Sequence, residues 1–296
     1  MANARAWSYQ EAFSRNIGLL TPPEQERLRR ACVAIAGLGG VGGVHALTLA
    51  RLGIGRFHLA DLDVFEPANM NRQAGAFVST LGQAKTEVMA RLLRDINPEV
   101  RVVTFGDGIH PENIDAFLDG VDVAIDGVDF FLMGPRRLLF RRARERGIYA
   151  ITSGPVGFGA TLHIFSPAGM SFDEFFDLRD GMSETEQVLH FGLGLAPKLA
   201  HIGYFPPSRI DLSRKSAPSL GPAVMLCAGV TATETLNLIL KRRKPKVVPH
   251  CFQFDPFAQA YKKTYLWWGN RNPVQRLKKW WLFRTHPALR AHCRGK

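Results

Sequence analysis

"IAGLGGVGGVHALTLARLGIGRFHLADLDVFEPANMNRQ", residues Ile35 to Gln73, decides the fold of this 296-residue chain. An apolar run with β-branched residues precedes glycines spaced as Gly-x-Gly-x-x-Gly at Gly37, Gly39 and Gly42. The glycines follow a predicted strand and open a predicted helix, which is the sequence context of a phosphate-binding turn. Backbone N–H groups and the positive end of the helix dipole stabilise phosphate charge in such a turn. The stretch therefore predicts a nucleotide-binding loop.

Strand-like and helix-like patterns alternate at regular spacing between about residues 30 and 155. The strand candidates are short apolar runs, and the segments between them carry helical patterns. This alternation predicts an α/β fold with a Rossmann-like, doubly wound, mostly parallel sheet. The predicted strands are CVAIAG (32–37), GRFHLAD (55–61), RVVTFG (101–106), VDVAIDG (121–127) and IYAITSG (148–154).

The alternation ends near residue 155, where a different pattern begins. GFGATLHIFSP (157–167) predicts a strand that starts a more antiparallel C-terminal section. Residues 166–222 are rich in Gly, Pro, Ser and Phe and show no clear period, and loops of that length are usually functional or mobile. Residues 221–244 predict one long, mostly apolar helix, and residues 248–266 predict two closing strands.

Composition narrows the class of protein. The chain is 46% hydrophobic, enough for a sizeable core, and no run of about 18 apolar residues predicts a membrane-spanning helix. The first residues lack the apolar segment of a signal peptide. The four cysteines are scattered, so reduced thiols in a cytoplasmic protein are expected. Most of the net charge of +12 belongs to residues 256–296, which contain ten Lys/Arg and no Asp/Glu.

Glycine turns of this kind hold either a dinucleotide or ATP, and the residues after the second strand distinguish the two. Asp61 ends that strand and is placed to bind a ribose hydroxyl. A Rossmann NAD or FAD oxidoreductase would have the same turn and the same aspartate. Here, however, Gly40 makes the pattern Gly-x-Gly-Gly-x-Gly, and DLDVFEPANMNRQ (61–73) and GQAK (82–85) follow it.

These motifs together resemble the ThiF/MoeB/HesA superfamily, which has the fold of ubiquitin-activating enzymes and their bacterial relatives. The resemblance covers about residues 8–165 well and residues 218–262 loosely. It implies ATP and Mg²⁺ as cofactors, because those proteins adenylate a carboxylate, which attacks the α-phosphorus of ATP and releases pyrophosphate. Such a reaction needs cations that spread charge off the phosphates, a metal ion and positioning, but no nucleophile from the protein.

The resemblance assigns a role to each matching residue. Arg72 and Lys85 lie beside the triphosphate, and Asp129 holds Mg²⁺, with Asp126 as an alternative ligand. Arg15 corresponds to an N-terminal arginine that reaches ATP from the neighbouring subunit, which implies a homodimer. The other expected nucleotide contacts are Gly37, Gly39, Gly40, Gly42, Asp61, Asp63, Asn69 and Asn71.

The chain departs from the family pattern in three places. The family usually reads Asp-Asn where this chain has Asp129-Phe130, so either an amide contact to the nucleotide is lost or Phe130 packs on the base. The two CxxC pairs that bind zinc in many relatives are absent, so no zinc is predicted. Residues 160–222 contain no cysteine, Cys227 lies in an apolar run, and Cys251 is the remaining candidate nucleophile. We therefore predict adenylation without an obligatory thioester, with the acyl-adenylate passing to an external nucleophile.

The C-terminal tail, residues 266–296, is basic and holds four of the five tryptophans. In its predicted helix, apolar residues gather on one part of the surface and arginines and lysines surround them. Such a helix is typical of a membrane interface or an acidic partner, with tRNA as a third candidate. The plain alternative is that its aromatic face packs on the body or on a second subunit. The apolar residues are Val274, Leu277, Trp280, Trp281 and Leu282.

The sequence thus predicts a ThiF-like adenylation domain over residues 1–265, with a nucleotide-binding part at about 30–155 and a crossing segment at about 166–222, followed by the tail. The expected protein is a cytoplasmic homodimer, peripheral at a membrane if the tail binds one. It activates a carboxylate, such as the C-terminus of a small ubiquitin-like protein or peptide. The alternatives are a tRNA-modifying enzyme like the threonylcarbamoyladenosine dehydratases, an NAD or FAD oxidoreductase, and a pseudo-enzyme that only binds.

Overall fold

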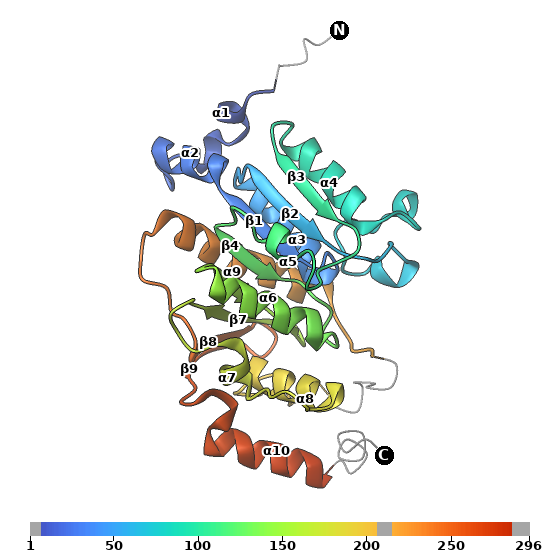
Figure 1. Ribbon diagram of the computed structural model, residues 1–296, viewed down its shortest axis with the longest axis vertical. Helices are drawn as coiled ribbons and strands as arrows, with labels where there is room; N and C mark the ends of the chain where they lie inside the picture. Colours follow the sequence, from blue (N-terminus) through green and yellow to red (C-terminus); the bar gives the residue numbers. More distant parts are fainter. Residues whose placement is uncertain (1–6, 206–214, 286–296) are drawn as a thin grey trace.

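The computed structural model describes residues 7–205 and 215–285, and this part of the chain is built around one sheet of nine strands (Figure 1). The strands lie in the order β3-β2-β1-β4-β5-β7-β8-β9, and β6 pairs with β7. Strands β1 to β5 are Cys32–Ala36, Arg56–Ala60, Arg101–Phe105, Val123–Asp126 and Tyr149–Thr152. Strands β6 to β9 are Pro155–Val156, Gly159–Phe165, His250–Asp255 and Ala260–Tyr265.

The sheet combines a parallel part with an antiparallel part. Strands β1 to β5 pair in parallel, whereas β7, β8 and β9 add to them in antiparallel fashion. The predicted fold, a Rossmann-like sheet continued by a more antiparallel section, is confirmed. Ala36 is in register with Ala60 on one side and with Asp126 on the other. The loops after β1, β2 and β4 therefore leave the sheet at one common edge.

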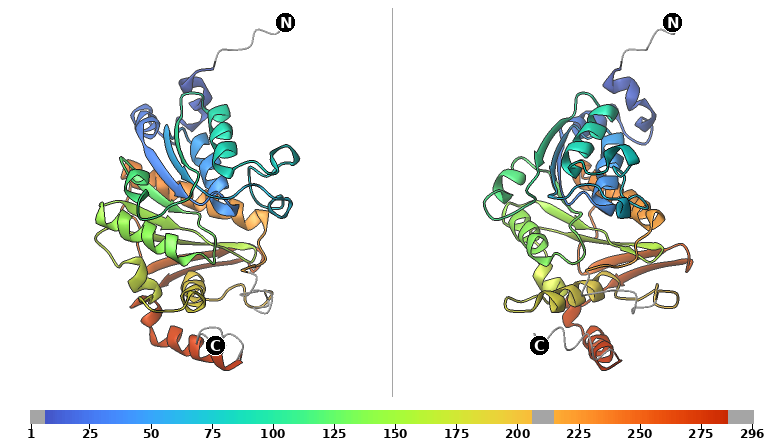
Figure 2. Two further views of the ribbon diagram at one scale, coloured as in Figure 1. Left: turned by 45° about the vertical axis from the view of Figure 1, so that its right-hand side comes forward. Right: turned by 90° about the vertical axis from the view of Figure 1, so that its right-hand side faces the viewer.

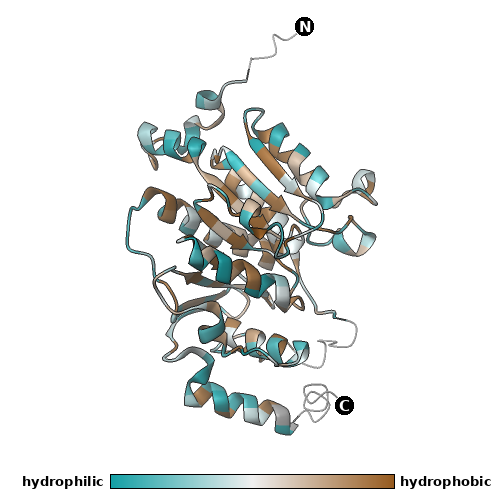
Figure 3. Ribbon diagram, viewed as in Figure 1, coloured by the Kyte–Doolittle hydropathy of each residue, from teal (hydrophilic) through white to brown (hydrophobic). Residues whose placement is uncertain are grey.

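Helices cover both faces of the sheet (Figure 2). Val33 and Ile35 of β1 point into one core and Ala34 and Ala36 into the other, which explains why this strand is apolar throughout. The hydropathy colouring shows the same apolar centre between more polar helix surfaces (Figure 3). The first core contains α2 (Pro22–Arg30), α3 (Gly40–Arg51), α4 (Lys85–Ile96) and α9 (Gly221–Leu240). The second contains α5 (Ile114–Phe117), α6 (Met133–Glu145), α7 (Phe172–Phe176) and α8 (Glu184–Leu195).

Short elements complete the described chain. Helix α2 begins as a capping box, since the Glu24 carboxylate accepts the N–H of Thr21 at 2.8 Å just before Pro22. The predicted helix of the tail is confirmed, and it lies at the end of the molecule remote from α1 (Figure 1). The remaining elements are α1 (Tyr9–Ala12), η1 (Ser14–Asn16), η2 (Pro67–Asn69), η3 (Val78–Thr80), η5 (Gly269–Arg271) and α10 (Pro273–Thr285).

Helix α9 is the long apolar helix that the sequence predicts. By length and composition alone it could cross a membrane, in contrast to the expectation of no such segment. However, 56% of that stretch is buried inside the molecule. Its buried residues pack against α3 and the sheet, as in the core helix of a globular domain.

The crossing segment contains two helices that the sequence analysis missed. The Ser171 hydroxyl accepts the N–H of Glu174 at 3.2 Å where α7 begins, and the Ser183 hydroxyl accepts the N–H of Glu186 at 3.2 Å where α8 begins. Ser-x-x-Glu is the usual start signal of a helix and was the available clue. The apolar period after each serine is too short or too interrupted by glycine to have revealed the helix.

Candidate nucleotide-binding site

The sheet changes winding direction between β1 and β4. The chain runs from β1 outwards through β2 and β3 and then returns to β4 on the other side of β1. In doubly wound sheets, ligands bind outside the carboxyl ends of the strands at this switch point. The glycine turn follows β1, Asp61 follows β2 and Asp129 lies in the loop after β4, so the structure brings these predicted site residues to the same edge.

The glycine turn and the loop after β4 touch through their backbones. Gly37 has a φ of +86°, and a Cβ there would lie 2.2 Å from the carbonyl oxygen of Gly127. A Cβ on Gly127 would lie 2.4 Å from the Gly37 oxygen, and one on Gly42 would lie 1.8 Å from it. Glycine is therefore required at all three positions. Gly39 is the N-cap of α3 and Gly40 begins it, so the free N–H groups of its first turn lie at the switch point.

Asp61 is held against the glycine turn. Its carboxylate accepts the N–H of Leu38 at 2.5 Å and the N–H of Asp63 at 2.9 Å. Burial raises the pKa of Asp61, and the neighbouring Lys85 ammonium acts in the opposite direction. Each carboxylate oxygen retains a second acceptor position, which a ribose hydroxyl would use.

Lys85 is the first residue of α4 and carries its ammonium between two aspartates. Its Nζ lies 2.9 Å from Asp63 Oδ2 and 4.0 Å from Asp61 Oδ1. The Lys85 side chain is only 6% exposed, whereas that of Asp63 is 58% exposed. Asp63 is free to turn to solvent, and Lys85 would then present a buried positive charge to a phosphate oxygen.

Arg72 lies beside the N-terminus of α3. A Cβ on Gly40 would be 3.6 Å from the Arg72 Cδ atom, so the arginine stem runs along the start of the helix. Its Nη1 donates to the carbonyl oxygen of Ala68 at 3.0 Å and to Asn71 Oδ1 at 2.9 Å. These two bonds fix the guanidinium next to the phosphate-binding turn.

The two predicted asparagines both make contacts within the protein. Asn69 Oδ1 accepts the N–H of Glu66 at 3.0 Å, and Asn71 Nδ2 donates to the carbonyl oxygen of Ser219 at 3.0 Å. The second bond joins the loop to the start of α9, where a Cβ on Gly221 would lie 3.0 Å from the backbone carbonyl oxygen of Asn71. A second helix N-terminus therefore lies near the Arg72 loop, which the sequence analysis did not predict.

Arg136 of α6 fixes the loop that carries Asp129, and the sequence analysis missed it. Its side chain is 3% exposed, and Nε donates to Asp126 Oδ2 at 2.8 Å. Asp126 is thus committed to a buried ion pair, which corrects its assignment as an alternative metal ligand. The other guanidinium N–H groups donate to the carbonyl oxygens of Val128, Asp129, Phe130 and Leu132. The sequence offers no clear signal, because Arg136 is one of several arginines in the helix that begins after Asp126 and its loop.

The Asp129 carboxylate is exposed and only partly used. Its Oδ1 accepts the N–H of Phe131 at 2.9 Å, and no group in the described chain donates to Oδ2. Among the described residues, no three His, Cys, Asp or Glu side chains form a cluster that could hold a metal. Mg²⁺ commonly takes one or two carboxylates together with substrate phosphates and waters. Asp129 therefore fits a Mg²⁺ ion that binds together with a triphosphate.

The Phe130 ring packs on the crossing segment. Its centroid lies 5.1 Å from that of Phe131 and 5.6 Å from that of Phe191 in α8. Phe130 therefore ties the Asp129 loop to α8, and both expectations for this departure from the family pattern, loss of an amide contact and packing on the base, remain predictions.

Comparison with known proteins identifies the family. The ThiF family profile matches residues 13–273, which is most of the chain. The chain belongs to the ThiF family. The membership predicted from the glycine turn and the motifs after it is confirmed.

Three known proteins illustrate what this chain is similar to. The tRNA threonylcarbamoyladenosine dehydratase of Haemophilus influenzae is 38% identical over 155 residues, 52% of this chain and 59% of that protein. The sulfur carrier protein adenylyltransferase of Thermus thermophilus is 26% identical over 255 residues, 86% of this chain and 85% of that protein. The E. coli tRNA N6-threonylcarbamoyladenosine dehydratase in complex with ATP superposes with a TM-score of 0.59 at 24% identity, covering 79% of this chain and 95% of that one. The chain spans about half the length of the first curated relatives that it matches.

Arg15 is the one predicted ThiF site residue that lies elsewhere in its own chain. It lies in η1, and the residue after it, Asn16, donates to the carbonyl oxygen of Leu52 at 3.3 Å. Leu52 caps the C-terminal end of α3, and the glycine turn is at the other end of that 12-residue helix, about 18 Å away. Arg15 can therefore reach a nucleotide only from a second subunit, and this role remains a prediction.

The thiols are unsuited to nucleophilic catalysis in the described chain. Cys227 and Cys251 are buried, and burial raises the pKa of each thiol to about 12. A nucleophilic cysteine needs a thiolate that is accessible at neutral pH. Cys251, the remaining candidate from the sequence, does not meet that requirement. Cys293 lies outside the described residues.

Proposed function

We propose that this ThiF-family protein uses ATP to activate a carboxylate as an acyl-adenylate and releases pyrophosphate. The observation that carries this proposal is the arrangement of Arg72 and Lys85 around the free N–H groups at the start of α3. Hydride transfer to a dinucleotide has no use for two cations beside the phosphates. Adenylation depends on them, because negative charge builds up on the leaving pyrophosphate.

In this proposal, each residue has a limited task. The backbone N–H groups of the glycine turn donate to the phosphates, and the Asp61 carboxylate accepts a hydrogen bond from a ribose hydroxyl. Arg72 and Lys85 offset phosphate charge, with Lys85 exchanging Asp63 for a phosphate oxygen. Arg136 positions the Asp129 loop. Mg²⁺, held by Asp129 and the triphosphate, would supply further charge neutralisation.

The substrate that we favour is the carboxylate at the C-terminus of a small carrier protein or peptide. The Thermus thermophilus relative, whose name describes adenylation of a sulfur carrier protein, aligns over 86% of this chain. A second candidate is a carboxylate on tRNA, since the Haemophilus influenzae dehydratase has the higher identity, although over a shorter region.

Pyrophosphate–ATP exchange tests the reaction. Exchange should require a carboxylate substrate, and C-terminal peptides of carrier proteins and tRNA bearing a carboxylate should be compared side by side. Exchange with tRNA alone would select the second candidate. Binding of NAD without binding of ATP would refute the proposal.

Subunit complementation tests the proposed homodimer. Arg15→Ala and Lys85→Ala subunits should each be inactive alone, because each site would need Arg15 from one chain and Lys85 from the other. Mixed dimers contain one site with both residues, so mixing the two variants should restore exchange. If Arg15→Ala alone keeps full activity as a strict monomer, the role given to Arg15 is wrong.

A further inference from the structure

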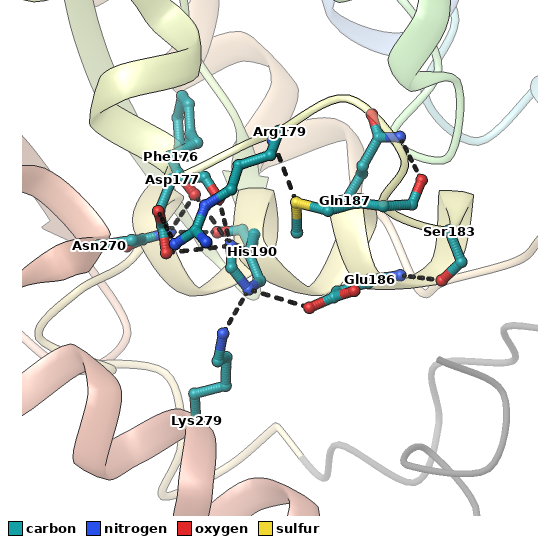
Figure 4. Close-up of polar contacts among 10 residues, drawn as sticks. Phe176, Asp177, Arg179, Ser183, Glu186, Gln187, His190, Asn270 and Lys279 are labelled. Carbon is teal, nitrogen blue, oxygen red and sulfur yellow. Dashed lines mark hydrogen bonds and ion pairs between the residues drawn. The ribbon is translucent and has the colours of Figure 1, made fainter. Parts of the chain in front are cut away.

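Helix α10 is attached to the body through polar side chains. Gln275 is 3% exposed and donates to a carbonyl group of α8 at 3.1 Å. Lys279 Nζ lies 2.7 Å from Nε2 of His190, also in α8 (Figure 4). Lys278 donates to a carbonyl group just beyond α8. Residues 275, 278 and 279 follow helical spacing, so one polar face of α10 is the docking face.

The other face of α10 is apolar and exposed. Val274 and Leu277 are 59% and 62% exposed, and Trp280 and Trp281 are 55% and 54% exposed. We call these four residues the outer face of α10. All four side chains are more than half exposed, so the outer face is not buried against the body, in contrast to one of the roles expected from the sequence.

This arrangement is the reverse of an ordinary surface helix. Such a helix turns its apolar stripe towards the core and its polar side chains towards water. Leaving two tryptophans, a leucine and a valine half exposed while lysines contact the body gives up hydrophobic free energy. An exposed apolar face next to a polar rim marks an interaction site. The turn before α10 adds two more exposed aromatics, Trp267 and Trp268, at 61% and 64%.

The charge around the outer face indicates the chemistry of its partner. Arg276 and Arg284 lie on exposed positions beside it, and the Arg284 guanidinium lies 5.3 Å from the Trp280 ring centroid. Residues 256–296 carry ten Lys/Arg and no Asp/Glu. A second copy of the chain would present the same positive charge and be repelled. RNA would match the charge but would offer no apolar medium to Val274 and Leu277.

We propose that α10 is a peripheral membrane anchor for bilayers that contain anionic lipids. Tryptophan and leucine side chains on one face and arginines around it are the pattern of a helix lying at the boundary between headgroups and acyl chains. The arginine stems reach up to the phosphates while the outer face enters the apolar region. The polar docking face keeps the helix fixed to the enzyme at the same time. This inference does not depend on the adenylation reaction.

Vesicle co-sedimentation of the full chain tests the anchor. Vesicles of phosphatidylcholine mixed with phosphatidylglycerol should bind the protein and shift its tryptophan emission to the blue, whereas phosphatidylcholine alone should bind it weakly. The double variant Leu277→Gln/Trp280→Gln should lose about tenfold or more in affinity. Arg276→Gln/Arg284→Gln should lose about fivefold for each arginine, on the anionic vesicles only.

A matched control uses the same substitutions at the other end of the molecule. Leu19 and Trp7 are 82% and 37% exposed, and Leu19→Gln/Trp7→Gln should leave vesicle binding unchanged. Circular dichroism and thermal unfolding verify that each variant is folded. Any of these results would overturn the proposal: no binding of the unaltered protein to anionic vesicles, equal loss in the control, or dissociation of a dimer by the outer-face variant in the absence of lipid. Tight binding of tRNA without vesicle binding would also overturn it.

Discussion

Two pairs of opposite charges follow β2 and β4, the strands on either side of β1, at the nucleotide edge of the sheet, and they differ in exposure. After β2, Lys85 meets Asp63, whose side chain is 58% exposed. After β4, Arg136 meets Asp126, and both side chains are at most 3% exposed. The first pair can open by rotation of the Asp63 side chain into water, whereas neither side chain of the second pair can reach water by such a rotation.

The difference separates binding from positioning. A pair that can open keeps its cation neutralised until a phosphate takes the place of the carboxylate, which is the role that we propose for Lys85 and Asp63. A closed pair holds backbone in place, and the Arg136 guanidinium does this by also donating to carbonyl groups of the Asp129 loop. Removal of one member of a buried pair leaves an unpaired charge inside the protein, which is far more costly than loss of a surface pair.

The largest effect is expected for Arg136→Met, which leaves Asp126 buried without its cation. The free energy of unfolding should fall by about 3–5 kcal/mol, measured by urea denaturation. Arg142 of the same helix is the matched control, because its pair with Asp115 is partly exposed. Arg142→Met should shift the denaturation midpoint far less, because partly exposed pairs contribute little to stability. Similar losses for both variants would mean that burial does not distinguish the two pairs.

Lys85→Met should come next and should act on activity. Exchange of pyrophosphate into ATP should fall by about 10²–10³-fold, because one cation beside the phosphates is lost. Arg91→Met on the same helix changes an exposed cation that bonds only to Gln83 in the described chain, and exchange should change less than about twofold. If Lys85→Met retains most of its exchange activity, the pair with Asp63 is structural rather than openable.

The smallest effect concerns a third polar contact, between His190 and Lys279, which protonation of His190 should break. Burial lowers the pKa of His190 and Lys279 lowers it further, while Asp177 and Glu186, 4.0 and 3.9 Å away, act in the opposite direction. A histidine in an unfolded chain titrates near pH 6.5. The docking of α10 should therefore be complete above about pH 6.5 and weaken as the pH falls, because protonated His190 cannot accept a hydrogen bond from Lys279.

Hydrogen exchange of the α10 amides measures this effect. Their exchange rate relative to the rest of the protein should rise about tenfold on acidification, which corresponds to loss of one hydrogen bond to a charged group. The same step should be absent in His190→Gln. His45 and His163, whose pKa burial lowers to about 3, should destabilise the whole protein in acid, so the readout must be confined to α10. A step of equal size in His190→Gln would contradict the assignment.

The sequence predicted the parallel part of the fold because each strand and its following glycine or aspartate lie within a few residues of one another. Gly37, Asp61 and Asp129 could be placed at one edge by strand periodicity alone. The helices α7 and α8 were missed because phenylalanines and glycines hide their period, although their serine caps are visible.

What the sequence could not show is pairing between distant segments. Arg136 stands among many arginines in α6, and nothing local marks it as the one that turns inward to Asp126. The position of α9 beside Asn71 depends on tertiary packing across 148 residues. The tail helix was predicted correctly, but which of its faces meets the body depends on acceptors in α8.

The backbone contact between Gly37 and Gly127 makes the two loops one evolutionary unit. A side chain at either position would collide with the other loop, and Gly37 also has a φ of +86° that side chains rarely adopt. Once a substitution at one position has pushed the loops apart, the collision at the other position is already relieved. A double variant should therefore be less harmful than the sum of the two single variants, and the cost that remains should be the backbone strain at Gly37.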